Sequence, residues 1–190
     1  GVPETKIETL ENWAPIESLP VLDQENDWSL EQGLDGKFCF LYSGSMGLKH
    51  NPDLLLSLAE KYRHDAAVKV VAVAEGSGAD FLSEKAKDLA LQETLIVLPL
   101  QPSERVPEVL ATASVLIATL EPEASHICVP SKAFSAVSVG CSLILNGSKE
   151  SDIYSELIEA SWHFGFGEYN RLKYFFSKID RIDIEKKQIK

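Results

Sequence analysis

Residues 115–146 read VLIATLEPEASHICVPSKAFSAVSVGCSLILN and contain, in order, an apolar run, a polar loop, a helical pattern and a second apolar run. Ser131 stands at the start of the helical pattern, as an N-cap or a first-turn hydroxyl, and Gly140 ends it. Between them, apolar side chains recur at helical spacing and give the helix one apolar face. This stretch therefore predicts a strand, a loop, a helix and a second strand.

Most of the chain repeats this alternation of apolar runs and helical patterns. The runs suited to strands buried on both faces are 38–43, 68–74, 94–98, 115–120 and 143–146. The other helical patterns are 52–63, 79–90, 103–113 and 151–161. Strands that alternate with helices indicate a parallel sheet wrapped by helices. The predicted fold class is therefore α/β, a single domain with a Rossmann-like parallel sheet and helices on both faces.

The two ends of the chain depart from this alternation. Residues 1–30 are polar and acidic, with three prolines and a short strand-like piece at 6–10, so we expect a linker or strap. Residues 31–167 are expected to form the domain. Residues 168–190 are expected to form a C-terminal helix and a charged tail.

The composition excludes several classes of protein. A formal net charge of −11 argues against nucleic acid and anionic lipid as partners. The sequence has no run of 18 apolar residues and no signal-peptide pattern at its start, so we expect a cytoplasmic protein without a membrane span. Its three cysteines and four histidines lack the spacing of a zinc site, so no metal is predicted, and no cofactor.

Two strand-to-helix turns have the chemistry of an anion site. The helix that begins at Ser131 points its N–H groups and positive dipole end to the crevice beyond the strand ends. The run at 38–43 leads to Gly44 and Ser45, where a glycine lets the backbone approach an anion, and Lys49 supplies a positive charge. We expect both turns to meet one diphosphate at the same edge of the sheet. Turns of this kind are equally compatible with a purely structural role.

The order of these residues resembles the donor-phosphate segment of retaining glycosyltransferases of the GT-B type, the glycosyl transferases group 1 family. In that family the segment commonly reads Pro-Ser-Lys-x-x-Glu-x-x-Ala-x-Gly-x-Pro-Val, and residues 130–132 and Gly140 stand in register with it. Residues 42–51 and 98–120 follow the layout of two other family segments. The family's paired glutamates would fall at Ile127 and Ser135, and neither is acidic. The chain thus resembles a divergent C-terminal, donor-binding domain of such an enzyme.

This resemblance implies a nucleoside-diphosphate sugar as the ligand and assigns residues to each part of it. The residues expected at the donor diphosphate are Gly44, Ser45, Lys49, Val129, Pro130, Ser131 and Lys132. Those expected at the nucleotide base and ribose are Glu75, Gly76, Leu100 and Ser135. With the paired glutamates absent, Glu123 and His126 are the nearest polar groups for the sugar. No catalytic residue is assigned.

The resemblance implies a domain that binds the nucleotide-sugar donor of a glycosyltransferase and is inactive without a missing N-terminal domain that binds the acceptor. One alternative is a non-catalytic relative that keeps the fold as an interaction module, because the glutamates are absent. A less favoured alternative is an NAD-binding Rossmann domain. Gly44 and Gly47 lack the spacing of the dinucleotide fingerprint, and Glu75 lies farther from Gly44 than the roughly 20 residues usual there.

Overall fold

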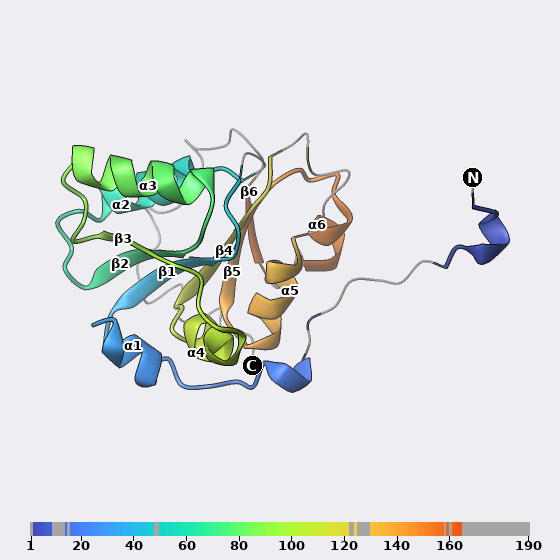
Figure 1. Ribbon diagram of the computed structural model, residues 1–190, viewed down its shortest axis with the longest axis horizontal. Helices are drawn as coiled ribbons and strands as arrows, with labels where there is room; N and C mark the ends of the chain where they lie inside the picture. The colour runs from blue at the N-terminus through green and yellow to red at the C-terminus, as the bar shows by residue number, and fades with distance from the viewer. Residues whose placement is uncertain are drawn as a thin grey trace.

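Six parallel strands form one sheet in the order β3-β2-β1-β4-β5-β6 (Figure 1). The computed structural model describes residues 2–8, 14, 16–47, 50–121, 124, 130–157, 159 and 161–164. The strands are β1 (Phe38–Ser43), β2 (Val68–Val73), β3 (Leu95–Leu98), β4 (Val115–Thr119), β5 (Ser142–Asn146) and β6 (Ser161–Phe164). The first five lie within one residue, at either end, of the apolar runs in the sequence. The predicted Rossmann-like α/β fold is therefore confirmed.

Helices cover both faces of this sheet. The helices are α1 (Asp27–Glu31), α2 (Asp53–Lys61), α3 (Ser77–Asp88), α4 (Val106–Ala111), α5 (Ser131–Ser138) and α6 (Asp152–Leu157). Short 3-10 helices lie at Glu4–Lys6, Ile16–Ser18 and Ser103–Arg105. Figure 1 shows α2 and α3 on one side of the sheet, and α1, α4 and α5 on the other.

Side chains of the strands point alternately to the two faces and form two core clusters. In β1, Phe40 and Tyr42 pack with α2 and α3, whereas Cys39 and Leu41 pack with the helices of the opposite face. All four side chains are fully buried. A parallel strand covered on both sides has no polar face, which is why its sequence is continuously apolar.

The strand order reverses between β1 and β4, which are hydrogen-bonded neighbours. Phe40 lies opposite Val115, and Leu41 opposite Leu116. From β1 the chain continues to α2 on one face, and from β4 it continues to α5 on the other. A reversal of this kind leaves a crevice beyond the carboxyl ends of the two strands, where open α/β sheets bind ligands.

Two elements differ from the sequence prediction at its ends. The helix expected at 151–161 stops at Leu157, and Ser161–Phe164 form β6, which pairs with β5. Within the expected strap, Asn26 and Ser29 form a capping box that begins α1, and Trp28 is fully buried in the core. The core of the domain therefore starts before residue 31.

The structure describes the two ends of the chain only in part. Lys6 ends a 3-10 helix, so the strand-like piece expected at 6–10 does not begin there, and residues 9 and 10 are outside the described part. The helix and tail expected at 168–190 also lie outside the described residues. Among those that the structure does describe, no helix is both long and apolar enough to cross a membrane.

Candidate functional site

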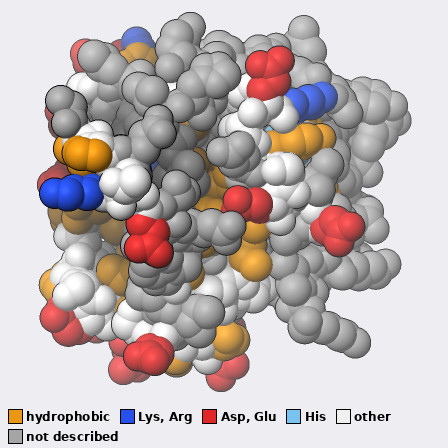
Figure 2. All heavy atoms as spheres, turned by 90° about the vertical axis from the view of Figure 1, so that its right-hand side faces the viewer, with side chains coloured by type: hydrophobic (Ala, Val, Ile, Leu, Met, Phe, Trp, Pro, Cys, Tyr) orange, Lys and Arg blue, Asp and Glu red, His pale blue; other side chains and the backbone are white. Residues whose placement is uncertain are grey.

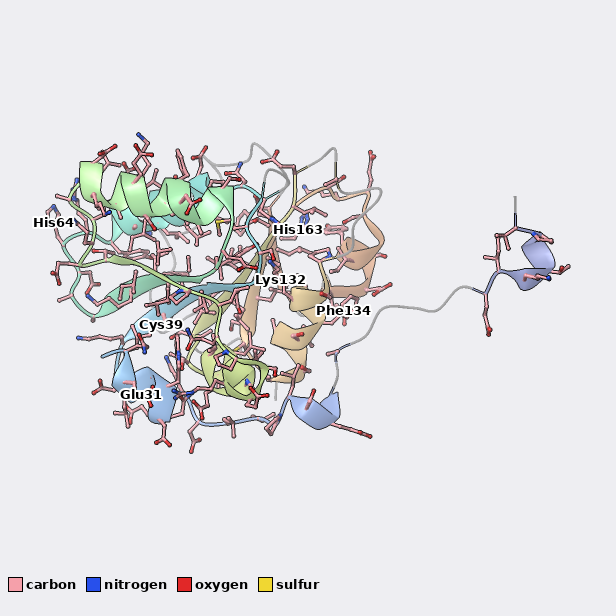
Figure 3. All side chains as sticks on the ribbon, in the orientation of Figure 1. Glu31, Cys39, His64, Lys132, Phe134 and His163 are labelled. Carbon is pink, nitrogen blue, oxygen red and sulfur yellow. The ribbon has the colours of Figure 1, made fainter. Side chains whose placement is uncertain are left out.

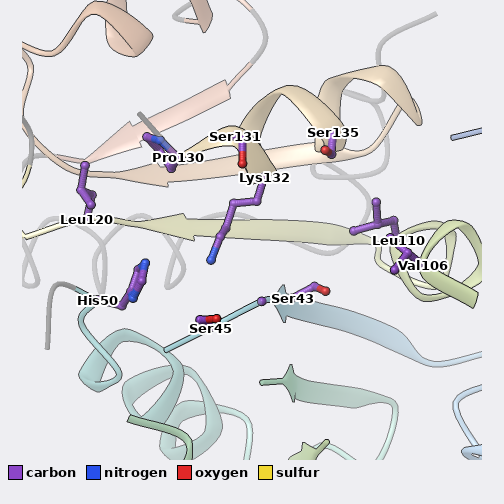
Figure 4. A pocket seen from close by; sticks show the side chains of 11 residues that line it. Ser43, Ser45, His50, Val106, Leu110, Leu120, Pro130, Ser131, Lys132 and Ser135 are labelled. Carbon is purple, nitrogen blue, oxygen red and sulfur yellow. The ribbon is translucent and has the colours of Figure 1, made fainter. Parts of the chain in front are cut away.

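A cleft of about 400 Å³ lies at the carboxyl ends of β1 and β4 (Figure 4). The loop after β1, the end of β4, α4 and the start of α5 all contribute to its wall. The lining residues are Ser43, Gly44, Ser45, His50, Val106, Leu110, Leu120, Pro130, Ser131, Lys132 and Ser135. The two turns that the sequence analysis assigned to one diphosphate therefore border a single cavity.

The N-terminus of α5 opens into this cleft. Pro130 is the N-cap, in an extended conformation and without a side-chain cap, and Ser131 is the first helical residue. The proline in front favours this start because its ring prevents it from donating a hydrogen bond to a preceding turn. Ser131 is therefore the first-turn hydroxyl of the two roles expected for it, and its side chain is exposed on the cleft wall.

The other end of α5 closes as the sequence indicates. Gly140 has a φ of 73°, and its N–H donates to the Val137 carbonyl at 3.0 Å. The N–H of Cys141 donates to the Ala136 carbonyl at 3.1 Å, which completes a Schellman motif. These two bonds satisfy carbonyl groups of the last turn of α5 and end the helix on the side away from the cleft.

Gly44 bends the chain immediately after β1. Its φ is 122°, a region that residues with a Cβ rarely adopt, and its N–H donates to the Val73 carbonyl at 3.0 Å. A Cβ at this position would lie 3.4 Å from Nζ of Lys132. The bend therefore lets the lysine of α5 lie directly against the backbone of the β1 loop.

The Lys132 ammonium lies between α5 and the end of β1 (Figure 3). Nζ donates to the Tyr42 hydroxyl at 2.6 Å and lies 3.8 Å from the centre of the Tyr42 ring. The hydroxyl in turn donates to the Ser45 carbonyl at 2.7 Å. Burial raises the pKa of Tyr42 well above its usual value, so the phenol keeps its proton at neutral pH.

Two apolar side chains of α4 line the far end of the cleft. Val106 and Leu110 lie one helical turn apart and face Ser135, which is one turn into α5 from Ser131 (Figure 4). Neither Val106 nor Leu110 was selected from the sequence. The sequence shows their helical spacing, but that spacing is equally typical of a helix face that packs on the core. His50 and Leu120, near the opposite end, were also missed.

Other predicted nucleotide residues lie away from this cleft. The turn at Glu75 and Gly76 packs against the β1 loop: the Met46 N–H donates to the Glu75 carbonyl at 2.8 Å, and the Gly78 N–H to the Met46 carbonyl at 2.8 Å. A Cβ on Gly78 would lie 2.5 Å from the Met46 side chain. Leu100 is 38% exposed and does not line the cleft. The turn at Glu75 and Gly76 therefore supports the β1 loop through backbone hydrogen bonds. Contacts of Glu75, Gly76 and Leu100 with a nucleotide stay predictions.

Several predicted site residues lie outside the described part of the chain. They are Lys49 and Val129 at the expected diphosphate, and Glu123 and His126 at the expected sugar. Glu121 is the second residue after β4 and lines a second hollow of about 410 Å³. His50 lines both this hollow and the cleft.

The described acidic side chains do not gather into a metal site. On the face turned to the viewer in Figure 2 they lie at separate points. In the described ranges no group of three or more His, Cys, Asp or Glu residues lies close enough together to hold a metal ion. In the described part of the cleft wall, the charge available to an anion is that of Lys132 together with the N-terminal dipole of α5.

Comparisons with known proteins relate this arrangement to one family. The family model described as "Glycosyl transferases group 1" matches residues 24–127, more than half of the chain. No match was found among curated protein sequences.

Solved structures share the fold at low sequence identity. The C-terminal domain of a glycosyl transferase group 1 family protein (LpcC) from Francisella tularensis has a TM-score of 0.69 at 13% identity, with 92% of each chain covered. HepE of Anabaena, in complex with UDP-glucose, has a TM-score of 0.71 at 15% identity, covering 93% of this chain and 48% of that one. A glycosyltransferase from Rickettsia africae has a TM-score of 0.68 at 16% identity, covering 98% and 51%. The chain thus spans about half the length of the last two proteins.

Proposed function

Because the chain belongs to the glycosyl transferases group 1 family, we propose that the cleft between β1, β4, α4 and α5 binds a nucleoside-diphosphate sugar as the donor of a sugar transfer. The resemblance seen in the sequence is confirmed at the level of family and fold. The ligand, the residues that hold it and the acceptor are the subject of the proposal.

The observation that carries the proposal is the meeting of Lys132, the N-terminus of α5 and the Gly44 bend in one cleft. A helix N-terminus without a side-chain cap from its N-cap residue favours a negative charge through its dipole, and an ammonium adds a charge-assisted donor. Ser131 adds a hydroxyl on the same wall. A diphosphate, with its dense negative charge and many acceptor oxygens, suits this end of the cleft.

The far end of the cleft suits a nucleoside. Val106 and Leu110 offer apolar side chains to the face of a base, and the Ser135 hydroxyl offers a hydrogen bond to a ribose. Ser135 lies one turn beyond Ser131 on the same helix, so both side chains face the same cavity. A ligand with a charged end and a flat, partly apolar end fits this polarity. A neighbour of the same fold, HepE, has been crystallised with UDP-glucose, which is a ligand of that kind.

In a sugar transfer the diphosphate leaves with increasing negative charge as the glycosidic bond breaks. Groups that stabilise this charge lower the barrier, provided that they are already in position. We assign this role to the Lys132 ammonium, the Ser131 hydroxyl and the first N–H groups of α5. Glu123 and His126, which stand in the sequence between β4 and α5, remain our candidates for contacts with the sugar.

The acceptor is proposed to bind in a second domain, opposite the cleft, since the chain covers about half of the length of two of the proteins above. Residues 1–190 alone are then expected to bind the donor but to transfer sugar negligibly. Robust transfer by this chain alone would contradict that expectation.

The proposal is tested by titrating the chain with UDP, GDP and ADP, and with the matching nucleosides, by isothermal calorimetry. We expect at least one diphosphate to bind, and to bind more tightly than its nucleoside. Thermal unfolding gives an independent readout, because ligand at 100 times its dissociation constant adds about 2.7 kcal/mol of stability. Failure of all three diphosphates to bind would refute donor binding.

That failure would favour a second candidate function, a non-catalytic interaction module. One feature of the sequence supports it: the two positions of the family's paired glutamates are Ile127 and Ser135. An isoleucine cannot accept hydrogen bonds from a sugar, and a serine binds a ribose through one hydroxyl instead of two carboxylate oxygens. Nucleotide binding therefore separates the two candidates directly.

A further inference from the structure

Tyr42 connects the core of the domain to the cleft. Its ring is fully buried in the cluster that β1 forms with α2 and α3, and the ring of His50 packs edge-on against it at 6.0 Å. Its hydroxyl end reaches the Gly44 bend, where it meets Ser45 and Lys132. The position of this hydroxyl is therefore set by the packing of the core, with little freedom to move.

The direction of the two hydrogen bonds at this hydroxyl is determined by their chemistry. An ammonium donates and cannot accept, so the Tyr42 oxygen accepts from Lys132. A carbonyl accepts, so the phenolic O–H donates its single hydrogen bond to the Ser45 carbonyl. The bond to Ser45 needs the neutral phenol, and burial keeps the proton on it by raising the pKa of Tyr42. The hydroxyl thus links the backbone of the β1 loop to the charge on α5.

A lysine side chain on a cleft wall has many rotamers of similar energy and places its charge poorly unless something holds it. Here the hydroxyl and the ring of Tyr42 act together: Nζ lies 2.6 Å from the oxygen and 3.8 Å from the ring centre. A ring face attracts a cation. Because residue 44 has no side chain, the ammonium can lie directly against the bend.

We propose that Tyr42 is a positioning residue: its hydroxyl and ring hold the Lys132 ammonium against the Gly44 bend, where the charge meets the diphosphate of the donor. This inference rests on the proposed function, since it assigns a role within the same site. Tyr42 itself acts through Lys132, and its own hydroxyl group donates its hydrogen bond to the Ser45 carbonyl.

The test is a double-mutant cycle on diphosphate affinity, with Tyr42→Phe, Lys132→Met and the combined variant. Tyr42→Phe removes one oxygen and keeps the ring, so the core stays filled. We expect it to weaken binding of the best-bound nucleoside diphosphate about fivefold, the effect of one typical hydrogen bond. It should leave the affinity for the matching nucleoside unchanged and have no further effect in the Lys132→Met background.

Tyr62→Phe is the matched control. Its ring packs on the same core cluster, stacked on Phe40 at 5.6 Å, but it does not line the cleft. We expect this variant to bind the diphosphate as the unmodified chain does. Urea unfolding of all variants shows whether each is folded under the conditions of the titration.

Unchanged diphosphate affinity in folded Tyr42→Phe would overturn the inference. An equal loss in the Lys132→Met background would also overturn it, because Tyr42 would then act without the lysine. Loss of nucleoside affinity alongside that of the diphosphate would point to a general distortion of the cleft and would likewise refute positioning. If the unmodified chain binds none of the three diphosphates, the proposed function itself fails, before any variants are compared.

Discussion

Replacing Lys132 by methionine removes the positive charge from the cleft while keeping a long, flexible side chain. In the structure this ammonium is held against the Gly44 bend, on the wall where α5 begins. A charge-assisted hydrogen bond contributes about 1.5–3 kcal/mol. The dissociation constant of a nucleoside diphosphate should therefore rise roughly 10- to 150-fold, since each 1.36 kcal/mol is a factor of about ten. The nucleoside alone should bind both proteins equally.

Calorimetric titration at low and high salt measures this effect and identifies its cause. If the lysine acts by its charge, affinity for the diphosphate should fall with added salt in the unmodified chain, and less steeply in Lys132→Met. Lys85→Met is the matched control. Lys85 is a partly exposed lysine on α3, with Nζ 3.5 Å from Oδ2 of Asp88, and it does not line the cleft. Its replacement changes the net charge of −11 by the same amount.

Two results would refute this reasoning. If Lys132→Met binds the diphosphate as tightly as the unmodified chain, then the ammonium does not reach the ligand. If Lys85→Met loses as much affinity, the effect belongs to the overall charge of the protein and says nothing about the cleft.

Three further predictions concern the framework of the site. Gly44→Ala should lose about 1 kcal/mol or more in urea unfolding, because of the φ of 122°, and should also weaken diphosphate binding; unchanged stability and affinity would contradict the role given to the bend. Trp28→Ala should lower the free energy of unfolding by about 3–5 kcal/mol in the same assay, since Trp28 is fully buried. A decrease below about 1 kcal/mol would show that α1 contributes little to the core of the domain. Burial raises the pKa of the Cys141 thiol to about 12, so iodoacetamide at pH 8 should alkylate it only after unfolding, as followed by peptide mass spectrometry; alkylation at the same rate in the native chain would contradict its burial.

The strands of the sheet were predictable because their environment is uniform. A parallel strand covered by helices is apolar over most of its length. β1 and β4 are apolar up to their last residue, and β2 is apolar apart from Lys69. Edge strand β6 was missed because its sequence lacks such a run. It has only four residues, reads SWHF, and its pattern is too short to be distinguished from the helix before it.

Helix α1 was missed because its surroundings are acidic and rich in proline. Its signal was nevertheless present: Asn26 and Ser29 have the spacing of a capping box, and Trp28 lies between them. A tryptophan in a polar stretch becomes informative once the helix around it is recognised. Its burial, however, depends on contacts with segments far along the chain, such as its hydrogen bond to Gln101 at 3.2 Å.

The turns of the candidate site divide in a similar way. Pro130 and Gly140 determine where α5 begins and ends, so the direction of its N-terminus could be predicted. The turn at Gly76 has the same local features as the Gly44 turn, yet it packs on Met46 instead of lining the cleft. No local pattern distinguishes a glycine that admits a ligand from one that admits a neighbouring backbone.

The sequence by itself determined the parallel α/β fold, the family, and the two turns at the candidate anion site, because backbone preferences and apolar periodicity are local properties of the chain. Only the tertiary structure decided that Tyr42 reaches Lys132 across 90 residues, and that Val106 and Leu110 form the apolar end of the cleft. Those contacts depend on the strand order, which puts β1 beside β4 and sends their helices to opposite faces. Side chains that are distant in sequence thus come to face one cavity.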